Sequence, residues 1–153
     1  MHCHAKREPV PWLAESADTA VFTTAFARRR LVAEHGLSFM LPLIVGHSNG
    51  LDLLLSAHRL RVPEALAMGL VNKVFCGEQL VPETYAYVRN LVDNVSPRSM
   101  QVIKRQQYDA PFQTVTENMI CANRDMAQSF ASEDFREGVA HFLERRAPRF
   151  AGR

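Results

Sequence analysis

The sequence predicts an α/β protein that is mostly helical, α+β by content, with one or two short strands. Residues 21–26 and 70–75 are rich in β-branched and aromatic side chains, which favour strands. After residue 82 the apolar side chains recur at helical spacing, which predicts further helices. The 153 residues suit one domain, and 47% of them are hydrophobic, which is enough for a sizeable core.

The first fifteen residues have no hydrophobic period and predict an irregular lead-in. His2, Cys3 and His4 could ligate a metal, but a zinc site needs a second, distant pair of ligands that the sequence does not show. No metal site is therefore predicted. Residues 21–26 predict a short strand or an extended segment, and residues 28–36 then predict a loop.

Three helices are predicted between the two strands. Ser38 suits the N-cap of the first and Gly46 its end. The second covers about residues 48–57, and the third is very short, with Pro63 at its first position and Gly69 just past its end. The predicted inner face of the second helix consists of Leu51, Leu54 and Leu55.

The rest of the chain predicts four helices, which are separated by capping residues and prolines. The first covers about residues 82–95, and Ser96 caps the second, which ends near residue 108. The third carries a long apolar stripe over residues 112–130, and Ser132 caps the last. The predicted inner face of the last helix consists of Phe135, Val139, Phe142 and Leu143.

Charge and composition exclude several classes of partner. The formal net charge of +2 is too small to indicate nucleic-acid binding. No apolar run is long enough to span a membrane, and the first residues lack the apolar region of a secretory signal. Three widely spaced cysteines favour a reducing, cytoplasmic setting. Two arginine-rich stretches, residues 28–30 and 145–153, suit either phosphate binding or a solvated face.

Four short motifs follow one another between about residues 17 and 150. They comprise residues 43–46 with 51–56, residues 64–65 with 69–74, residues 96–104, and residues 130–145. Each motif is weak by itself, but four in the right order and spacing make a strong signal. Together they resemble the crotonase superfamily, the enoyl-CoA hydratase/isomerase family, and specifically its C-terminal portion.

This resemblance implies a fold and a domain organisation. The chain would form the last part of a spiral of ββα units. Residues 1–16 would be a non-matching lead-in, residues 17–75 the end of the spiral core, and residues 76–153 a helical oligomerisation region. In the family that helical region makes trimers, which are often paired into hexamers.

The resemblance also implies a chemistry. Family members act on acyl-CoA thioesters and stabilise an enolate with two backbone N–H groups, the oxyanion hole. Carboxylates on nearby loops move protons. Neither a metal nor a cofactor is needed, because coenzyme A is part of the substrate. The oxyanion donors and one catalytic glutamate lie upstream of the matched region, and this counts against activity of the chain alone.

Glu34 is the predicted catalytic residue. When Phe22 is aligned with the phenylalanine of the hydratase pattern, Phe26 stands at the catalytic glutamate, and phenylalanine transfers no proton. Glu34 follows eight residues later, at about the loop position where the sequence resembles dienoyl-CoA isomerases in carrying an acid. Alternatively, Glu34 is a solvated acid paired with one of residues 28–30. His35 is a weaker candidate.

Phe142 and Arg145 are the predicted coenzyme-binding residues. They match positions in the final helix where family members pack on the CoA adenine and meet its phosphates, commonly from a neighbouring subunit. An aromatic face with a cation nearby suits a phosphorylated nucleotide. Alternatively, Phe142 belongs to the core and Arg145 complements the helix dipole. The stripe over residues 112–130 is predicted to be core or trimer interface.

Three hypotheses remain open at this point. The chain is an acyl-CoA enzyme with Glu34 as acid/base, a catalytically inactive remnant, or an assembly module that docks with full-length relatives. An unusually exposed apolar surface would support either of the last two, because half a spiral leaves core residues uncovered.

Overall fold

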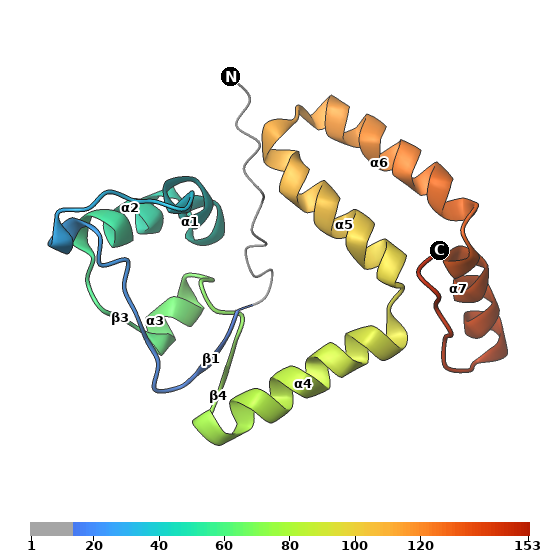
Figure 1. The fold of residues 1–153 in the computed structure, drawn as a ribbon, viewed down its shortest axis with the longest axis horizontal. Coiled ribbons are helices and arrows are strands. Elements are labelled where there is room, and N and C mark those ends of the chain that lie inside the picture. Colours follow the sequence, from blue (N-terminus) through green and yellow to red (C-terminus); the bar gives the residue numbers. More distant parts are fainter. Residues whose placement is uncertain (1–13) are drawn as a thin grey trace. The chain divides into compact units, whose positions relative to one another are not determined.

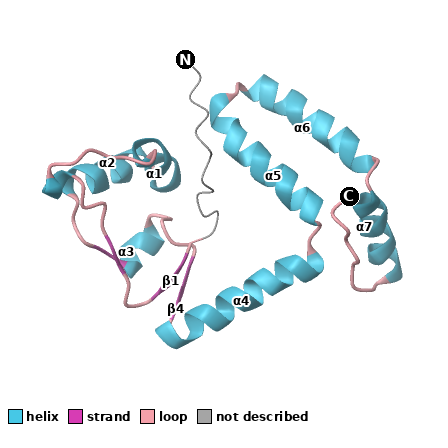
Figure 2. Ribbon diagram, in the orientation of Figure 1, coloured by secondary structure: helices cyan, strands magenta, loops and turns pink. Residues whose placement is uncertain are grey.

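The computed structural model describes residues 14–153, which form two compact units, residues 14–84 and 85–153 (Figure 1). Helices dominate both units and the strands are short (Figure 2), so the expected fold class is confirmed. The elements are β1 (Glu15–Ala17), β2 (Val21–Phe22), a 3-10 helix (Ala27–Arg29), α1 (Leu37–Val45), α2 (His47–Ser56), β3 (Leu60–Arg61), α3 (Val62–Ala67), β4 (Lys73–Phe75), α4 (Gly77–Asn94), α5 (Pro97–Asp109), a 3-10 helix (Ala110–Phe112), α6 (Val115–Phe130) and α7 (Glu133–Glu144).

The first unit contains two small sheets. β1 pairs in parallel with β4, with Ser16 opposite Val74, and β2 pairs antiparallel with β3, with Val21 opposite Arg61. Glu15 was predicted to belong to an irregular lead-in, but β1 begins at this residue. The lack of a hydrophobic period in so short a strand hid its pairing with β4, which lies far along the sequence.

The first strand is shorter than predicted. Only Val21–Phe22 of the short strand or extended segment expected over residues 21–26 pairs with a neighbour. The next two side chains bind the end of α2 instead: Thr23 donates its hydroxyl to the carbonyl of Ala57, at 3.1 Å, and Thr24 donates to that of Leu53, at 2.7 Å. β-Branched residues therefore serve here as anchors of a loop on a helix rather than as strand residues.

The second strand is also shorter, because the end of α3 takes up its first residues. Gly69 adopts a left-handed φ of 78°, as its predicted place after the helix requires. The N–H of Leu70 then turns back to the carbonyl of Ala65, at 2.9 Å. The strand expected over residues 70–75 consequently begins only at Lys73.

α1 and α2 form the core of the first unit, and two details differ from the prediction. Ser38 does not cap α1, because the helix begins at Leu37 and Gly36 is its N-cap, with φ 75°. The inner face of α2 is also shifted: Leu54 packs against the core as predicted, but Leu53 is the buried residue, at 4% exposed. Leu51 and Leu55 are 48% and 68% exposed. Gly46 ends α1 as predicted. The buried core consists of Leu41, Val45, Leu53, Leu60, Ala65 and Val71.

A glycine explains the shifted face of α2. A β-carbon placed on Gly50 would lie only 2.9 Å from the Cα of Pro42, so the two helices cross with backbone close to backbone. That close approach turns Gly50 and Leu53, one helical turn apart, toward α1.

We expect Gly50→Ala to lower the free energy of unfolding of the first unit by about 2 kcal/mol, because the added methyl overlaps backbone atoms that cannot move aside locally. The matched control is Gly77→Ala, where a β-carbon would meet nothing within 4 Å. There alanine should be neutral or stabilising by up to about 1 kcal/mol. Urea unfolding followed by circular dichroism measures both, and equal stabilities of the two variants would contradict the crossing.

The second unit consists of helices that begin at side-chain caps. Ser96 accepts a hydrogen bond from the N–H of Ser99, and Ser132 accepts one from the N–H of Phe135, so both predicted caps are confirmed. α6 begins at a capping box that was not predicted. The side chains of Thr114 and Glu117 each accept a hydrogen bond from the backbone N–H of the other residue.

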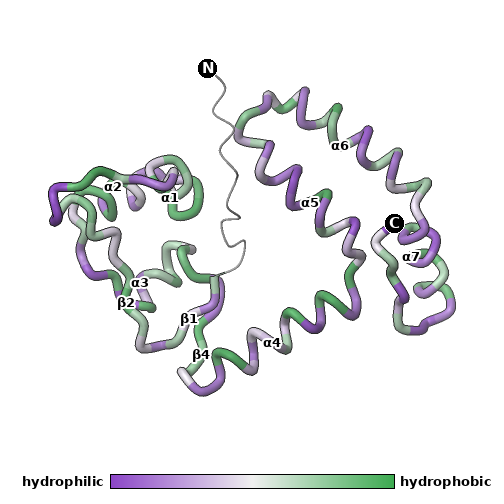
Figure 3. The backbone as a smooth tube through the Cα atoms, in the orientation of Figure 1, coloured by the Kyte–Doolittle hydropathy of each residue, from purple (hydrophilic) through white to green (hydrophobic). Residues whose placement is uncertain are grey.

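Hydrophobic and hydrophilic residues alternate along these helices (Figure 3). Many of the large hydrophobic side chains are exposed. The inner face predicted for α7 is wrong: Phe142 is 76% and Leu143 73% exposed, while the buried residue of this helix is Asp134. Large exposed apolar surface marks a place of interaction. The exposed apolar residues of α5, α6 and α7 include Ile103, Val115, Met119, Ile120, Met126, Phe130, Phe135, Val139, Phe142 and Leu143. Within residues 14–153, no helix has the length and apolar character that crossing a membrane requires.

Candidate functional site

Glu34 lies in the exposed loop that leads into α1. Its side chain is 59% exposed, and its Oε1 lies 3.8 Å from Nε2 of His35, whose side chain is 86% exposed. An ion pair this open to water contributes little to stability. Arg28, one of the arginines considered as a partner for Glu34, donates its Nε–H to the carbonyl of Ser56 instead, at 2.9 Å.

The backbone beside Glu34 has an unusual conformation. His35 and Gly36 adopt φ values of 55° and 75°, two consecutive left-handed residues. The Glu34 carbonyl accepts the N–H of Leu37, at 3.0 Å, and thereby closes the turn onto the first residue of α1. Left-handed residues other than glycine are uncommon and concentrate at functional sites. The turn fixes the backbone from which the exposed side chain of Glu34 extends.

Phe26, the residue that aligns with the hydratase glutamate, is half-buried and begins the 3-10 helix Ala27–Arg29. Its carbonyl accepts the N–H groups of Arg29 and Leu31. The position therefore has a structural role in this loop, and its side chain carries no group that could transfer a proton.

Phe142 and Arg145 lie near the C-terminal end of α7. Both side chains are exposed, so Phe142 is not part of the core of this unit. Arg145 ends the helix in a left-handed conformation, φ 54°, and its N–H donates to the carbonyl of His141. The structure thus places an exposed aromatic ring and an exposed guanidinium three residues apart at one helix end.

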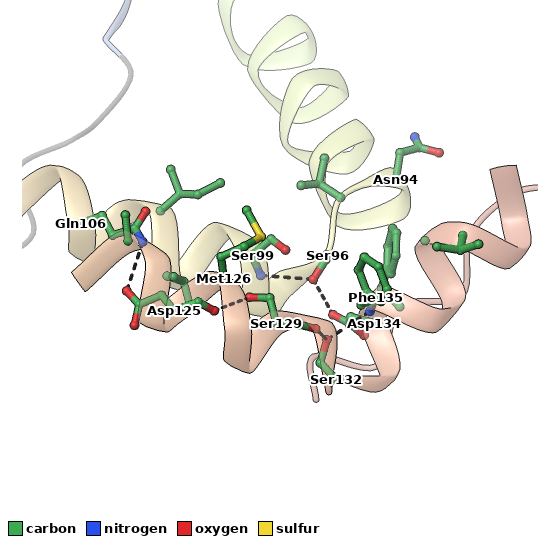
Figure 4. Close-up of a pocket in the computed structure, with 17 residues that line it drawn as sticks. Asn94, Ser96, Ser99, Gln106, Asp125, Met126, Ser129, Ser132, Asp134 and Phe135 are labelled. Atoms are coloured by element: carbon green, nitrogen blue, oxygen red, sulfur yellow. Dashed lines mark hydrogen bonds between the residues drawn. The ribbon is translucent and has the colours of Figure 1, made fainter. Parts of the chain in front are cut away.

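α5, α6 and α7 enclose a groove of about 530 Å³ with apolar walls (Figure 4). Two buried carboxylates, Asp125 and Asp134, lie along it, and each is 4% exposed. Neither was predicted to be buried: Asp125 lies within the stripe over residues 112–130, and Asp134 lies in the first turn of the last helix, where an acid suits the helix dipole.

Hydrogen bonds occupy both carboxylates (Figure 4). Asp125 accepts a hydrogen bond from Arg105, at 2.7 Å. It also accepts one from Gln106, at 3.0 Å, which Figure 4 shows. The bond from Arg105, which outweighs burial, holds the pKa of Asp125 below its usual value. Carboxylates whose oxygens already accept hydrogen bonds from the protein hold helices together rather than exchange protons with a ligand. The groove is therefore structural, and it does not compete with Glu34 as a catalytic centre.

Asp134 binds three segments at once. Burial raises its pKa, but hydrogen bonds from Ser96 and from the backbone N–H groups of Ala151, Gly152 and Arg98 outweigh this effect, and the pKa lies below its usual value. The contacts measure 2.5 Å from Ser96, 2.8 Å from Ala151 and 3.0 Å from Gly152. The starts of α5 and α7 and the end of the chain meet at this one carboxylate.

Among residues 14–153, no three histidine, cysteine or acidic side chains are grouped so that they could hold a metal ion. The motif of His2, Cys3 and His4 lies outside the described residues.

Glu137 makes stability depend on pH. The hydrogen bond from Arg146, which outweighs burial and is joined by one from the N–H of Arg149, lowers the pKa of Glu137 from 4.5 to about 2. Because the folded-state pKa is lowered, the stabilisation is complete above about pH 4.5 and is lost as the pH falls toward 2. We expect Glu137→Gln to lower Tm at pH 7 and to match the wild type near pH 2. A constant difference in Tm across this range, measured by circular dichroism, would contradict the ion pair.

Comparisons with known proteins agree on one family. The sequence model of the enoyl-CoA hydratase/isomerase family matches residues 13–153. The chain is 29% identical over 138 residues to a probable enoyl-CoA hydratase of Mycobacterium leprae, covering 90% of this chain and 53% of that protein. It is 26% identical to the 1,2-epoxyphenylacetyl-CoA isomerase of Escherichia coli, covering 90% of this chain and 52% of that protein.

The fold agrees with the sequence comparison. The crystal structure of an enoyl-CoA hydratase from Mycobacterium tuberculosis matches with a TM-score of 0.87 at 25% identity, covering 92% of this chain and 56% of that one. The chain thus spans about half the length of the relatives that it matches. Since the family model covers nearly all of the described residues, the chain belongs to the enoyl-CoA hydratase/isomerase family, within the crotonase superfamily.

Proposed function

We propose that the protein acts on acyl-CoA thioesters by enolate stabilisation and proton transfer, with Glu34 as the acid/base. The observation that carries this proposal is the placement of Glu34, whose exposed side chain extends from a backbone fixed by the left-handed turn of His35 and Gly36. Relatives named enoyl-CoA hydratases and an acyl-CoA isomerase support the substrate class.

Glu34 would move a proton to or from a carbon near the thioester while negative charge develops on the thioester oxygen. That charge calls for two preorganised N–H donors, which are usually the largest single source of catalysis in such sites. We assign these donors to the part of the family fold that this chain does not span. No metal and no separate cofactor takes part in the proposed reaction.

Phe142 and Arg145 would recognise the coenzyme A part of the substrate. A ring that is 76% exposed at the end of α7 offers a face for the adenine. The guanidinium of Arg145 would form charge-assisted hydrogen bonds with a phosphate.

We further propose that the protein forms a trimer, or a hexamer of paired trimers, in a reducing cytoplasmic compartment and serves fatty acid metabolism. The exposed apolar faces of α5, α6 and α7 support self-association. Cys76 and Cys121 are free thiols, which fits a reducing compartment.

Turnover of the purified chain with crotonyl-CoA and with a dienoyl-CoA tests the proposal. Both reactions change the absorbance of the conjugated thioester, and circular dichroism confirms that the chain is folded. Hydration or isomerisation above the uncatalysed rate would support the catalytic role. No turnover in folded chain would overturn activity of this chain by itself.

The exposed apolar surface favours a second candidate function, an assembly module without activity of its own. Such a chain would dock through α5, α6 and α7 onto a full-length relative. Size-exclusion chromatography of this chain mixed with a full-length enoyl-CoA hydratase tests this function. A stable mixed complex without turnover by the chain alone would support it, and separate elution would count against it.

A further inference from the structure

The chain reverses direction at the end of α7 and runs back along the helix that it has just left (Figure 1). We call residues 146–153 the C-terminal strap. Its contacts recur along α7 at intervals of about one turn. Phe150 packs edge-on against His141, the N–H of Arg149 donates to Glu137 at 2.7 Å, and the N–H of Ala151 donates to Asp134.

Arg146 fastens the beginning of this strap. Its two terminal nitrogens donate to the two carboxylate oxygens of Glu137, at 2.5 and 2.8 Å, and its Nε donates to Glu144, at 2.5 Å. A two-pronged contact of this kind fixes the orientation of both partners. The side chain of Glu137 is 19% exposed and that of Arg146 32%, so the pair is sheltered from solvent in part.

Two adjacent arginines therefore have opposite surroundings. Arg146 is held by two carboxylates, whereas none of the ion pairs found within residues 14–153 involves Arg145, which is exposed. The left-handed conformation of Arg145 is unfavourable for any residue except glycine. The contacts of the strap must offset this cost. The two-pronged contact between Arg146 and Glu137, called the fork below, is the one nearest to Arg145 along the chain.

We propose that Glu137 is a positioning residue for coenzyme recognition: by holding Arg146, it fixes the chain reversal that presents Arg145 at the same helix end as Phe142. This inference rests on the proposed role of Phe142 and Arg145 in binding coenzyme A. Glu137 itself would not touch the ligand. Its contribution is preorganisation, because a helix end that is already fixed loses less conformational freedom when a phosphate binds.

Calorimetric titration of the full chain with coenzyme A tests the inference, together with hydrogen exchange of residues 146–153. Arg145→Gly removes the guanidinium but keeps a residue suited to the left-handed turn, so affinity should fall about tenfold with the strap still protected. Glu137→Gln should lower affinity several-fold and speed exchange in the strap. Glu83→Gln, an exposed carboxylate on α4, should change neither.

The double variant Arg145→Gly with Glu137→Gln separates positioning from mere stability. If Glu137 acts through Arg145, its loss should cost no further affinity once the guanidinium is absent. Arg146→Lys, which keeps the charge but loses the fork, should resemble Glu137→Gln and serves as a second test should that variant not fold.

The outcomes distinguish this inference from the proposal on which it rests. Failure of the wild-type chain to bind coenzyme A would overturn the proposed coenzyme site, and the positioning role with it. Normal coenzyme affinity of Glu137→Gln with a freely exchanging strap would overturn the positioning role alone. Additive losses of affinity in the double variant would also overturn it.

Discussion

Replacing Glu34 with glutamine is expected to lower turnover of an acyl-CoA substrate by about 100-fold, the lower end of the effect of removing a general acid/base. Glutamine keeps the size and hydrogen-bonding capacity of the side chain but cannot exchange a proton. Because Glu34 is exposed and makes only a weak ion pair with His35, the substitution should leave Tm unchanged. The measurement is the initial rate with crotonyl-CoA and a dienoyl-CoA in a form of the protein that shows activity.

Two controls make that result specific. Glu83→Gln removes an exposed carboxylate from α4 and should leave the rate unchanged. His35→Gly keeps Glu34 and suits the left-handed backbone, so it tests whether the imidazole itself takes part. Near-normal turnover of Glu34→Gln would remove Glu34 from the mechanism. A loss confined to His35→Gly would transfer the role to the histidine.

The sequence predicts features of this fold that depend on neighbours in the chain. Ser96 and Ser132 cap helices because their hydroxyls reach an N–H three residues away. Gly69 follows α3 because the end of that helix demands a positive φ. Such requirements are met within one turn, and a local pattern therefore suffices to recognise them.

Features that depend on contacts between distant residues could not be predicted from local sequence patterns. Thr23 and Thr24 have strand propensity, but the carbonyls that their hydroxyls bind lie about thirty residues away, on α2. The face of α2 depends on the close approach of Gly50 to Pro42, which the spacing of leucines cannot indicate. In both cases tertiary structure overrides a local propensity.

The same difference between local patterns and distant contacts applies to the candidate site. Glu34 was found by its position relative to a family motif, yet the turn that holds it depends on a left-handed histidine, which propensity argues against. Arg145 was found in the same way, while the fork that fixes it joins residues nine positions apart, Glu137 and Arg146. Motifs locate the groups that are candidates for chemistry. The contacts that orient those groups become visible only in the folded chain.

The apolar residues of α7 show a different kind of error. Phe142 and Leu143 have the spacing of a buried face and are nevertheless exposed. Helical periodicity predicts which side is apolar, but it does not say what covers that side. In this chain the side chains packed by the strap include polar ones, such as Asp134 and His141, and the apolar side remains open to a partner.

Asp134→Ala should have the largest effect on stability in the second unit, a loss of about 3 kcal/mol in the free energy of unfolding. The carboxylate is 4% exposed and accepts hydrogen bonds from Ser96 and from the N–H groups of Ala151 and Gly152. Alanine would leave the buried hydroxyl of Ser96 and the two backbone N–H groups without their acceptor, and leaving a buried donor unpaired costs more than the bond itself contributed. Urea unfolding gives the free energy, and hydrogen exchange in α5 and α7 localises the loss.

The adjacent Glu133 provides the control, because it occupies the same first turn of α7 and shares the favourable interaction with the helix dipole. Its side chain is 56% exposed and pairs with Arg153 at the surface. Glu133→Ala should therefore cost less than about 1 kcal/mol. If both variants lost the same free energy, the dipole would explain the effect and the buried network would not. A loss confined to Asp134→Ala, with faster exchange at both helix starts, would show that one carboxylate joins α5, α7 and the C-terminal strap.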